Sequence, residues 1–203
     1  MNVFFDLDGT LIDVRSRLYK LFCDLIAPQQ ISFSDYWRIK RRGVSNVDIL
    51  QSEFGYTVPE TELFVQRWME QIETARYLKL DTIFAQSIPT LMRLTHCQCF
   101  IVTARQHYDV AHQQVADLRL LQHIAGLLVT SQKMSKVHLI ESMGLTLSSD
   151  DVLVGDTGTD INAGKTLGIR TVAVTSGVLS KSTLKAYKPD HIAEDVGRIP
   201  DLL

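Results

Sequence analysis

The sequence of 203 residues is poor in the residues that mark disulfide-rich and zinc-binding proteins. It has three cysteines, Cys23, Cys97 and Cys99, and no pair has the Cys-x-x-Cys spacing of a redox or zinc motif. We therefore expect neither a disulfide framework nor a zinc site, and we expect a reducing compartment, the cytoplasm. The six histidines have no His-x-His or His-Glu-x-x-His spacing, so none is assigned to a metal.

An excess of charge of one sign and long apolar runs are also missing. The 21 Lys and Arg residues nearly balance the 23 Asp and Glu residues, which leaves a formal net charge of -2 and no general basic surface for nucleic acid. No apolar run approaches the roughly 20 residues that span a bilayer. No basic and apolar leader follows Met1, so nothing marks export. We expect no nucleic-acid and no membrane partner.

Short apolar runs rich in Val, Ile and Phe alternate with helical patterns along most of the chain. This alternation predicts an α/β fold, a parallel sheet flanked by helices. Ligands of such sheets bind at the carboxyl ends of the strands, where polar residues cluster in this sequence. The expected strands cover residues 2–6, 98–103, 125–130, 151–155 and 170–175, with a weak sixth near 190–193, and the expected helices cover residues 86–95, 107–121, 136–143 and 159–167.

Between Asp13 and about Thr82 the pattern is helical only. It predicts a small helical cap domain over residues 14–82, inserted into a core domain made of residues 1–13 and 83–203. The helices are delimited by Pro28, by the expected N-caps Ser34 and Ser45, by Gly55 as a C-terminal stop and by Pro59 as a first helical residue.

Two carboxylates, Asp6 and Asp8, follow the first expected strand and precede a Gly-Thr turn. Residues two apart in a strand project to the same side. Like charges this close repel each other unless a cation or a shared proton compensates. The spacing therefore predicts a site for a hard metal ion beside a reactive carboxylate.

Two further segments carry groups suited to an anion. Thr103 ends the second strand, and its hydroxyl, with the backbone N–H groups of the next turn, could bind a phosphate oxygen, or it could satisfy its own turn. Ser135 is a plausible N-cap that places Lys136 at a helix start, where the helix dipole disfavours a cation. That cost indicates an anionic partner, the alternative being a solvated surface lysine. Lys133 competes with Lys136 for this role, and spacing alone does not decide between them.

The fourth strand ends in a second pair of carboxylates. Asp156 and Asp160 straddle a Gly turn and form a plausible ligand set for magnesium, which proteins hold by one or two carboxylates together with waters and phosphate oxygens. Capping of the following helix by Thr159 or Asp160 is the alternative. Capping explains one acid and leaves Asp156 unexplained.

These four clusters, in this order, resemble those of the haloacid dehalogenase (HAD) superfamily, in its phosphatase branch near the phosphoglycolate phosphatases. The resemblance rests on Asp-x-Asp-Gly-Thr at residues 6–10 and on Gly-Asp-x-x-x-Asp at residues 155–160. It covers the whole chain and implies a Rossmann-like core, a parallel β-sheet flanked by helices, with an inserted α-helical cap. Dehalogenases resemble this chain but lack an equivalent of Asp8, so its presence favours phosphate chemistry.

The resemblance also implies roles for individual residues. Asp6 would attack phosphorus and form an aspartyl-phosphate, and Asp8 would be the general acid and base, with its backbone carbonyl on the metal. Thr103 would hold the phosphoryl group, and Lys136 would neutralise charge. The implied ligands of Mg²⁺ are Asp6, Asp8, Asp156 and Asp160, and the implied substrate contacts in the core are Thr10, Ala104 and Arg105.

Substrate choice is expected to depend on the cap. Residues 38–46 concentrate four cations before a Gly turn, and they resemble the specificity loop of phosphoglycolate phosphatases and beta-phosphoglucomutases. Arg41, Arg42, Gly43 and Ser45 could therefore meet a second anionic group of the substrate, the alternative being a solvated helix face. Arg15 and Arg17, just after the first linker, could also face the cleft.

The combined expectation is a magnesium-dependent phosphatase that hydrolyses a small phosphorylated metabolite, phosphoglycolate-like, through an aspartyl-phosphate intermediate. A phosphomutase of the beta-phosphoglucomutase type is the alternative enzyme, and a non-catalytic binding protein that retains the fold is the alternative from another class. The sequence leaves open the substrate itself and the choice between a monomer and a homodimer.

Overall fold

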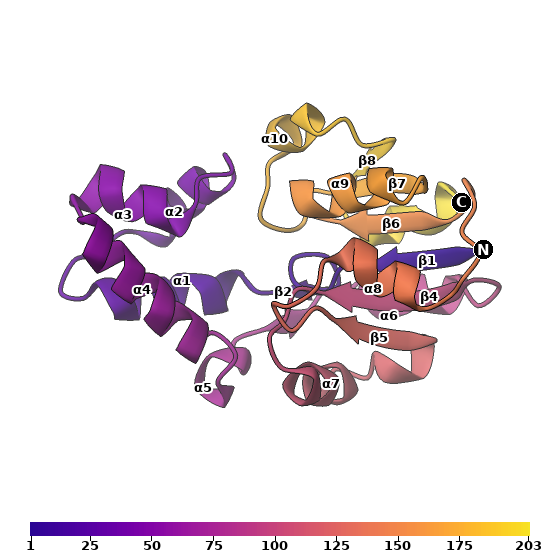
Figure 1. The fold of residues 1–203 in the computed structure, drawn as a ribbon, viewed down its shortest axis with the longest axis horizontal. Coiled ribbons are helices and arrows are strands. Elements are labelled where there is room, and N and C mark those ends of the chain that lie inside the picture. Colours follow the sequence, from indigo (N-terminus) through magenta and orange to yellow (C-terminus); the bar gives the residue numbers. More distant parts are fainter.

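A computed structural model describes all 203 residues and shows two parts side by side (Figure 1). One part is a six-stranded sheet with helices on both faces, and the other is a group of five helices. We call residues 14–81 the insertion and the rest of the chain the body. Both chain termini lie at the end of the body that is far from the insertion (Figure 1).

The sheet of the body is parallel throughout, as the sequence predicts, and it includes the weak sixth strand. Phe5 of the first strand pairs with both Ile101 and Val154, so the chain leaves three neighbouring strands at the same edge. The strands are β1 (Asn2–Phe5), β4 (Gln98–Thr103), β5 (Gly126–Val129), β6 (Val152–Gly155), β7 (Arg170–Val174) and β8 (His191–Ala193), in the order β5-β4-β1-β6-β7-β8.

Helices bury both faces of this sheet, which explains why the strands are continuous apolar runs. Phe4 packs on one face, in a cluster with residues of α8 (Lys136–Ser142) and α9 (Gly158–Thr166). Val3 and Phe5 pack on the other face, with residues of α6 (Ser87–Arg93), α7 (Tyr108–Asp117) and the short helix η2 (Val196–Asp201). The remaining elements of the body are η1 (Leu121–His123) and α10 (Lys181–Ala186).

The insertion has an apolar core of its own, separate from the two clusters on the sheet. Its helices are α1 (Arg15–Ile26), α2 (Phe33–Lys40), α3 (Asn46–Phe54), α4 (Val58–Gln71) and α5 (Ala75–Leu78). The buried side chains of this core are Phe22, Ile26, Tyr36, Trp37, Ile39, Ile49, Leu50 and Phe64.

Most of the predicted helix ends in the insertion are confirmed, and two are shifted. Ser45 caps α3, and Gly55 ends it at a φ of +69°. The expected N-cap Ser34 is wrong, because Ser32 accepts the Asp35 N–H and Ser34 lies in the first turn. Both serines precede a helical pattern, but only Ser32 has an acid three residues later, and its hydroxyl also donates to that carboxylate. Pro59 is the second residue of α4 rather than the first.

A short two-stranded antiparallel sheet, which the sequence does not predict, connects the two parts. It pairs β2 (Ile12–Asp13) with β3 (Thr82–Ile83). Strands of two residues are too short to show a period-2 pattern, which is why the sequence gives no sign of them. β2 and β3 lie at the two predicted boundaries of the helical cap, and the independence of the two parts as domains stays a prediction.

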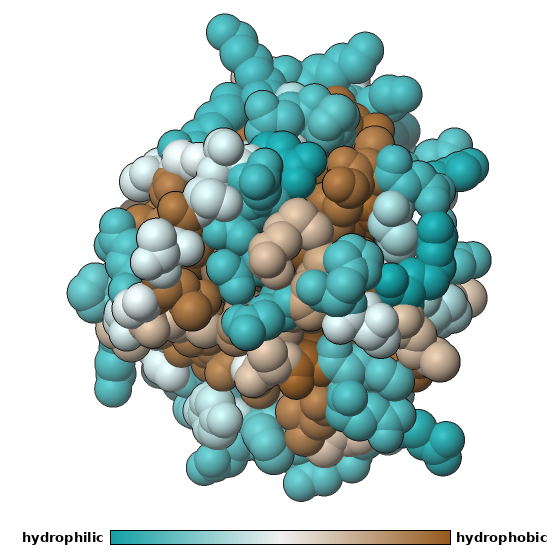
Figure 2. Space-filling model, turned by 90° about the vertical axis from the view of Figure 1, so that its right-hand side faces the viewer, coloured by the Kyte–Doolittle hydropathy of each residue, from teal (hydrophilic) through white to brown (hydrophobic).

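The surface of the body opposite the insertion is mixed in character. Figure 2 shows hydrophobic side chains interspersed with hydrophilic ones over this end of the molecule, which is ordinary for a globular protein. No helix has both the length and the apolar character that crossing a bilayer requires. All three cysteines are free thiols.

Candidate active site

Asp6 lies directly after the central strand β1, at the carboxyl edge of the sheet. Its backbone N–H donates to the Val154 carbonyl at 2.8 Å, which extends the pairing with β6 by one residue. Its own Oδ1 accepts the Leu7 N–H at 2.8 Å, which fixes the orientation of the carboxylate. The residue is only 8% exposed. The backbone therefore places a buried carboxylate at the point where a doubly wound sheet binds its ligand.

Lys136 holds this carboxylate and that of Asp160 together. Its Nζ lies 2.7 Å from Asp6 Oδ1 and 2.6 Å from Asp160 Oδ1. Lys136 begins α8, behind the N-cap Ser135, so the two acids offset the unfavourable helix dipole that the sequence indicates. Burial alone would lower the pKa of Lys136, but the charges of Asp160 and Asp6 outweigh burial and raise it above its ordinary value. The lysine is therefore a fixed cation.

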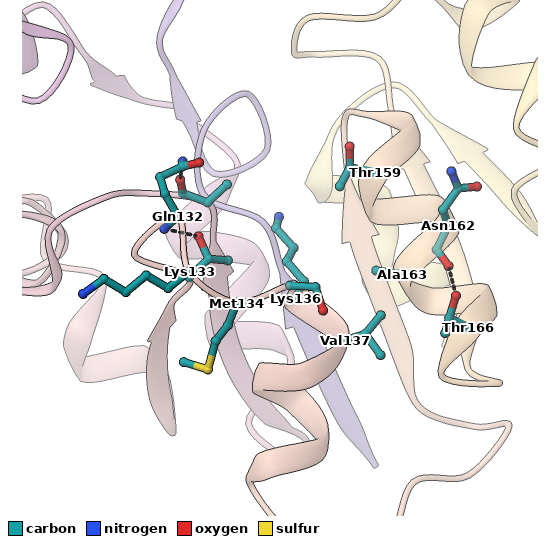
Figure 3. Close-up of a pocket in the computed structure, with 12 residues that line it drawn as sticks. Gln132, Lys133, Met134, Lys136, Val137, Thr159, Asn162, Ala163 and Thr166 are labelled. Carbon is teal, nitrogen blue, oxygen red and sulfur yellow. Dashed lines mark hydrogen bonds between the residues drawn. The ribbon is translucent and has the colours of Figure 1, made fainter. Parts of the chain in front are cut away.

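The structure separates the two candidate lysines. Lys133 is exposed and lines a neighbouring cavity of about 470 Å³ between α8 and α9, which also has Ala104, Lys136 and Thr159 in its wall. In Figure 3 the Lys133 side chain points away from that of Lys136. Of the two lysines, only Lys136 contacts Asp6.

Asp156 follows β6 and is fully buried at the same edge. Its Oδ2 accepts the Val178 N–H at 2.6 Å, but its Oδ1 has no hydrogen-bond partner. Burial, followed by the charges of Asp6 and Asp160, raises the pKa of Asp156 well above its ordinary value. A buried carboxylate oxygen without a partner is costly unless something satisfies it, so this atom is suited to a bound cation.

The acids at this edge fit a divalent metal ion. Carboxylate oxygens of Asp6, Asp156 and Asp160 lie within 4.8 Å of one another. Burial also raises the pKa of Asp6, to about 7, although the charge of Lys136 opposes the increase. A bound dication reverses both effects, because it favours the ionised carboxylates. Oxygen ligands of this kind suit a hard cation such as magnesium.

Asp160 differs from the other two acids because both of its oxygens have partners. Oδ1 accepts from Lys136, and Oδ2 accepts from the Thr157 hydroxyl at 2.6 Å and from the Thr157 N–H at 3.2 Å. Thr157 and Asp160 form a capping box at the start of α9. The capping alternative therefore holds for Asp160, and this residue positions Lys136.

These groups open into a pocket of about 280 Å³ between the body and the insertion. Helix α1 and the residue before it provide two apolar side chains to its wall, Val14 and Leu18. Lys136 is the only cationic side chain in the wall. The full lining is Asp6, Asp8, Val14, Leu18, Ala104, Lys136, Asp156, Thr157, Thr159, Asp160 and Val178.

Asp8 also lines this pocket, but two arginines hold its carboxylate. Arg105 donates from Nε to Oδ2 at 2.7 Å and from Nη2 to Oδ1 at 2.6 Å, and Arg17 donates from Nη2 to Oδ2 at 2.9 Å. Burial alone would raise the pKa of Asp8, but Arg105 and then Arg17 outweigh it and hold this pKa well below its usual range. In this conformation Asp8 is an ionised carboxylate.

A second acid completes the group around the two arginines. This acid is Asp81, just before β3. Its Oδ1 lies 3.0 Å from Arg17 Nε, and its Oδ2 lies 3.5 Å from Arg105 Nη2 and accepts from Gln114 Nε2 at 2.8 Å. Burial raises the pKa of Asp81 to about 6, against the charge of Arg17. The group links helix α1 of the insertion to the body, since Arg17 belongs to the first and Arg105 to the second.

Five other expected site residues are not part of the pocket wall. Thr103 ends β4, buried, beside the pocket residue Ala104. Thr10 is buried, and its hydroxyl has no hydrogen-bond partner. Three residues of the α2–α3 loop lie outside the pocket: Arg42 is exposed, Gly43 faces Thr183 and Leu179, and Ser45 caps α3.

Two contributors were missed at the sequence level. The Val178 N–H that holds Asp156 follows the polar turn after β7, which ends at the same edge as β1 and β6. This position, the carboxyl end of a parallel strand, is a signal that was available. No signal in the sequence marks Asp81, because it is a single acid at the end of a stretch with a helical pattern.

Comparison with known proteins agrees with this architecture. A family model described as HAD-hydrolase-like matches residues 126–199. Pyrophosphatase PpaX of Oceanobacillus iheyensis is 24% identical over 215 residues, which cover 96% of this chain and 92% of the relative.

Solved structures share the whole fold. A haloacid dehalogenase-like family hydrolase from Streptococcus pneumoniae superposes with a TM-score of 0.78 at 23% identity, covering 99% of this chain and 97% of that one. A predicted phosphoglycolate phosphatase from Haemophilus somnus gives a TM-score of 0.73 at 20% identity, covering 99% and 96%. These structures show the same fold. With the family match and the full-length relative, they make the chain similar to haloacid dehalogenase-like hydrolases, enzymes of the phosphatase type.

Proposed function

We propose that the protein is a magnesium-dependent phosphomonoester hydrolase that acts on a small phosphorylated metabolite through an aspartyl-phosphate on Asp6. The observation that carries this proposal is the buried Asp6 carboxylate, 2.7 Å from the Lys136 ammonium and beside the unpartnered Oδ1 of Asp156. A nucleophile that must approach an anionic phosphoryl group needs fixed positive charge around it, and this edge of the sheet supports that arrangement.

In the first half of the reaction, an Asp6 carboxylate oxygen attacks phosphorus and the bond from phosphorus to the leaving oxygen breaks. A carboxylic proton from Asp8 passes to that oxygen, so the leaving group departs as an alcohol. Lys136 offsets negative charge on the attacking and transferring groups throughout. Asp8 must therefore be free of the two arginines and carry a proton at this stage.

In the second half, water hydrolyses the aspartyl-phosphate. Asp8, now a carboxylate, takes a proton from the water that attacks phosphorus, and the bond to Asp6 breaks, releasing inorganic phosphate. Splitting the hydrolysis into two displacements makes each step easier than direct attack by water. The apolar Val14 and Leu18 in the wall help to exclude other water from the intermediate.

Asp6 and Asp156 are the residues proposed to hold magnesium, with the Asp8 carbonyl as the ligand that the family resemblance implies. When bound, the ion supplies charge neutralisation at the phosphoryl oxygens and orients them. YfnB from Bacillus subtilis, a chain of this fold with a TM-score of 0.68 at 16% identity, has been solved bound to magnesium.

The size of the pocket supports a small substrate, and two candidates follow from the relatives. A pocket of about 280 Å³ accommodates phosphoglycolate, and one protein of this fold is a predicted phosphoglycolate phosphatase. Pyrophosphate is the second candidate, because the full-length relative is a pyrophosphatase. Attack by Asp6 on pyrophosphate differs only in the leaving group, which is phosphate instead of an alcohol.

The test is a screen of phosphorylated metabolites, with pyrophosphate among them, with and without magnesium. We expect magnesium-dependent release of phosphate and a phosphorylated Asp6 peptide detectable by mass spectrometry after rapid quenching. Asp6→Asn removes the nucleophile and should abolish both signals while the circular dichroism spectrum stays unchanged. Turnover that survives this substitution, or that needs no metal, contradicts the mechanism. Stimulation by a sugar bisphosphate would favour the phosphomutase instead.

Other expectations from the sequence stay predictions. We propose a cytoplasmic location on the ground that all three cysteines are free thiols. The choice between a monomer and a homodimer, and the expected lack of nucleic-acid and membrane partners, stay untested.

A further inference from the structure

The strongest unexplained feature of the molecule is the buried pair Arg17 and Arg105, which we call the arginine pair. The exposed fractions of these residues are 1% and 3%. They come from different parts of the chain, α1 and the turn after β4, and they converge on one carboxylate, that of Asp8. Phosphoryl transfer by Asp6 and Lys136 does not by itself require them, so they need an explanation of their own.

The arginine pair keeps its shortest ion pairs only while Asp8 is in place. Two arginines face two carboxylates, Asp8 and Asp81, in a buried setting. Arg105 Nη1 has no hydrogen-bond partner even so. If the Asp8 carboxylate leaves, Asp81 is the one carboxylate left in ion-pair contact, and the charge of Glu73 acts on Arg105 without such a contact. The guanidinium N–H groups that donated to Asp8 then lack an acceptor, and buried donors without a partner are costly. Release of Asp8 is therefore favourable only when another anion takes its place.

The proposed reaction requires that release. The arginine pair engages both Asp8 oxygens, through Arg105 at 2.6 and 2.7 Å and Arg17 at 2.9 Å. An acid that serves the leaving oxygen must have an oxygen free to reach it, within about 2.6 to 3.2 Å. Asp8 must lie beside the leaving group to protonate its oxygen. Arg17 and Arg105, which contact Asp8, therefore lie near the leaving group as well.

We propose that the arginine pair binds a second oxyanion carried on the leaving group of the substrate, in exchange for the Asp8 carboxylate. The proposal rests on the proposed phosphatase function and specifies its substrate class: phosphate esters or anhydrides whose leaving group carries a carboxylate or phosphate. A guanidinium fork matches either oxyanion. Binding of the correct leaving group then frees the acid that it needs, and an uncharged leaving group frees it poorly.

The surroundings of the pocket favour this assignment over the α2–α3 loop. Lys136 is the only cation in the wall, and Asp6 and Asp160 already occupy it. Arg42 is exposed and outside the wall, and Arg15 pairs with Asp13. Asp8 is the pocket residue proposed as the acid for the leaving oxygen. Apart from Lys136, the arginine pair is the cationic group near the pocket, and it contacts Asp8 directly.

The test measures binding of three phosphonates by calorimetry in the presence of magnesium. Phosphonoacetate carries a second carboxylate, methylenediphosphonate carries a second phosphonate, and ethylphosphonate carries neither. We expect the wild type to bind at least one of the first two about tenfold or more tighter than ethylphosphonate, as one charged hydrogen-bonding pair typically provides. Tighter binding of phosphonoacetate would indicate a substrate whose leaving group carries a carboxylate, and tighter binding of methylenediphosphonate would indicate one that carries a phosphate. Equal binding of all three overturns the proposal.

Substitutions locate the preference. Arg17→Met with Asp81→Asn removes one charge of each sign, so the net charge of the buried group does not change. We expect this double variant to lose most of the tenfold preference, and Arg15→Met, on the same helix, to keep it. A preference that survives in the double variant but disappears in Arg42→Met overturns the assignment. If Arg17→Met/Asp81→Asn does not fold, Arg17→Lys, which keeps the charge but loses the fork, should reduce the preference severalfold.

A separate readout distinguishes this inference from the function on which it rests. The wild type is assayed with p-nitrophenyl phosphate, whose leaving group carries no second oxyanion and needs little help from an acid. Absence of any magnesium-dependent turnover with this or any other ester contradicts the proposed function. Turnover without a preference for the second oxyanion contradicts only the role of the arginine pair.

Discussion

Lys136 Nζ lies 2.7 Å from Asp6 Oδ1, and this contact joins the start of helix α8 to the end of the central strand. The pair brings a fixed cation to the proposed nucleophile, and Asp160 holds the cation from the other side at 2.6 Å. Each partner lies at the end of a different element of secondary structure, so the contact exists only in the folded chain. Four predictions follow from this edge of the sheet.

Lys136→Ala should lower turnover by about a hundredfold or more, because it removes charge neutralisation at the attacking carboxylate. Lys133→Ala should change turnover by less than about twofold, as expected for an exposed side chain away from the pocket. Steady-state kinetics of both variants with one ester check this. Equal losses in the two variants would remove the distinction between the lysines.

Asp156→Asn should raise the magnesium concentration for half-maximal activity by about tenfold or more, because it removes a negative oxygen from the proposed metal site. Without metal, the same variant should be at least as stable as the wild type, since an amide avoids the repulsion among the three buried acids and can still accept the Val178 N–H. Chemical denaturation in EDTA measures this. Magnesium at a hundred times its dissociation constant should then stabilise the wild type by about 2.7 kcal/mol, and the variant by less.

The metal-free protein should lose stability as the pH rises. Burial raises the pKa of Asp6 from 3.8 to about 7 and that of Asp81 from 3.8 to about 6, so the folded state binds more protons than the unfolded state between these values. The free energy of unfolding therefore falls as pH increases from about 4 to about 7, by up to about 1.4 kcal/mol per pH unit for each proton. Asp8, whose pKa is lowered, contributes in the opposite sense only below about pH 4.

Denaturation in EDTA at pH 5, 6, 7 and 8 checks the direction of this effect. Magnesium should reverse the trend, since the metal competes with these protons and binds more tightly at higher pH. A metal-free stability that is flat or that rises over this range would show that the buried acids are ionised without a cation.

Gly177→Ala should weaken magnesium activation, because a Cβ at this position would lie 2.1 Å from Asp156 Oδ2. The carboxylate must shift, which disturbs the neighbouring bond from the Val178 N–H, and overpacking of this kind costs about 1 to 3 kcal/mol. Gly144→Ala is the matched control. It has a positive φ of +67° but no atom within 4 Å of its Cβ, so it should reduce stability through backbone strain and leave magnesium activation unchanged.

Much of the body was predictable from the sequence, because its four inner strands, β1, β4, β6 and β7, are apolar runs buried on both faces, and such runs are visible without an alignment. The insertion was predictable as helical for a similar reason, the spacing of Leu18, Leu21, Phe22 and Ile26. Helix starts were less certain where two caps compete, as Ser32 and Ser34 do. The strands β2 and β3 were not predictable, since two residues carry no period.

The candidate site divides in the same way. Asp6, Asp8 and Asp156 were singled out because acids directly after buried strands are costly without a purpose. Arg105 and Arg17 were named as possible substrate and cleft residues, but their pairing with Asp8 was not predicted. They lie 88 positions apart in the sequence, and only the docking of α1 on the body brings them together. Val178 acts through its backbone N–H, which every residue type except proline has, so its role leaves no mark in the sequence.

The antiparallel ladder of β2 and β3 has a consequence for how such enzymes diversify. Asp13 pairs directly with Thr82, so the two points where the chain departs from the body and returns to it are neighbours. A tight reverse turn is enough to close that gap, and a long excursion closes it equally well, because the ends need no rearrangement. Evolution can therefore lengthen, shorten or replace everything between these residues without moving Asp6 or Lys136. At the β2–β3 ladder the insertion, and with it substrate specificity, can therefore change while the catalytic residues stay in place.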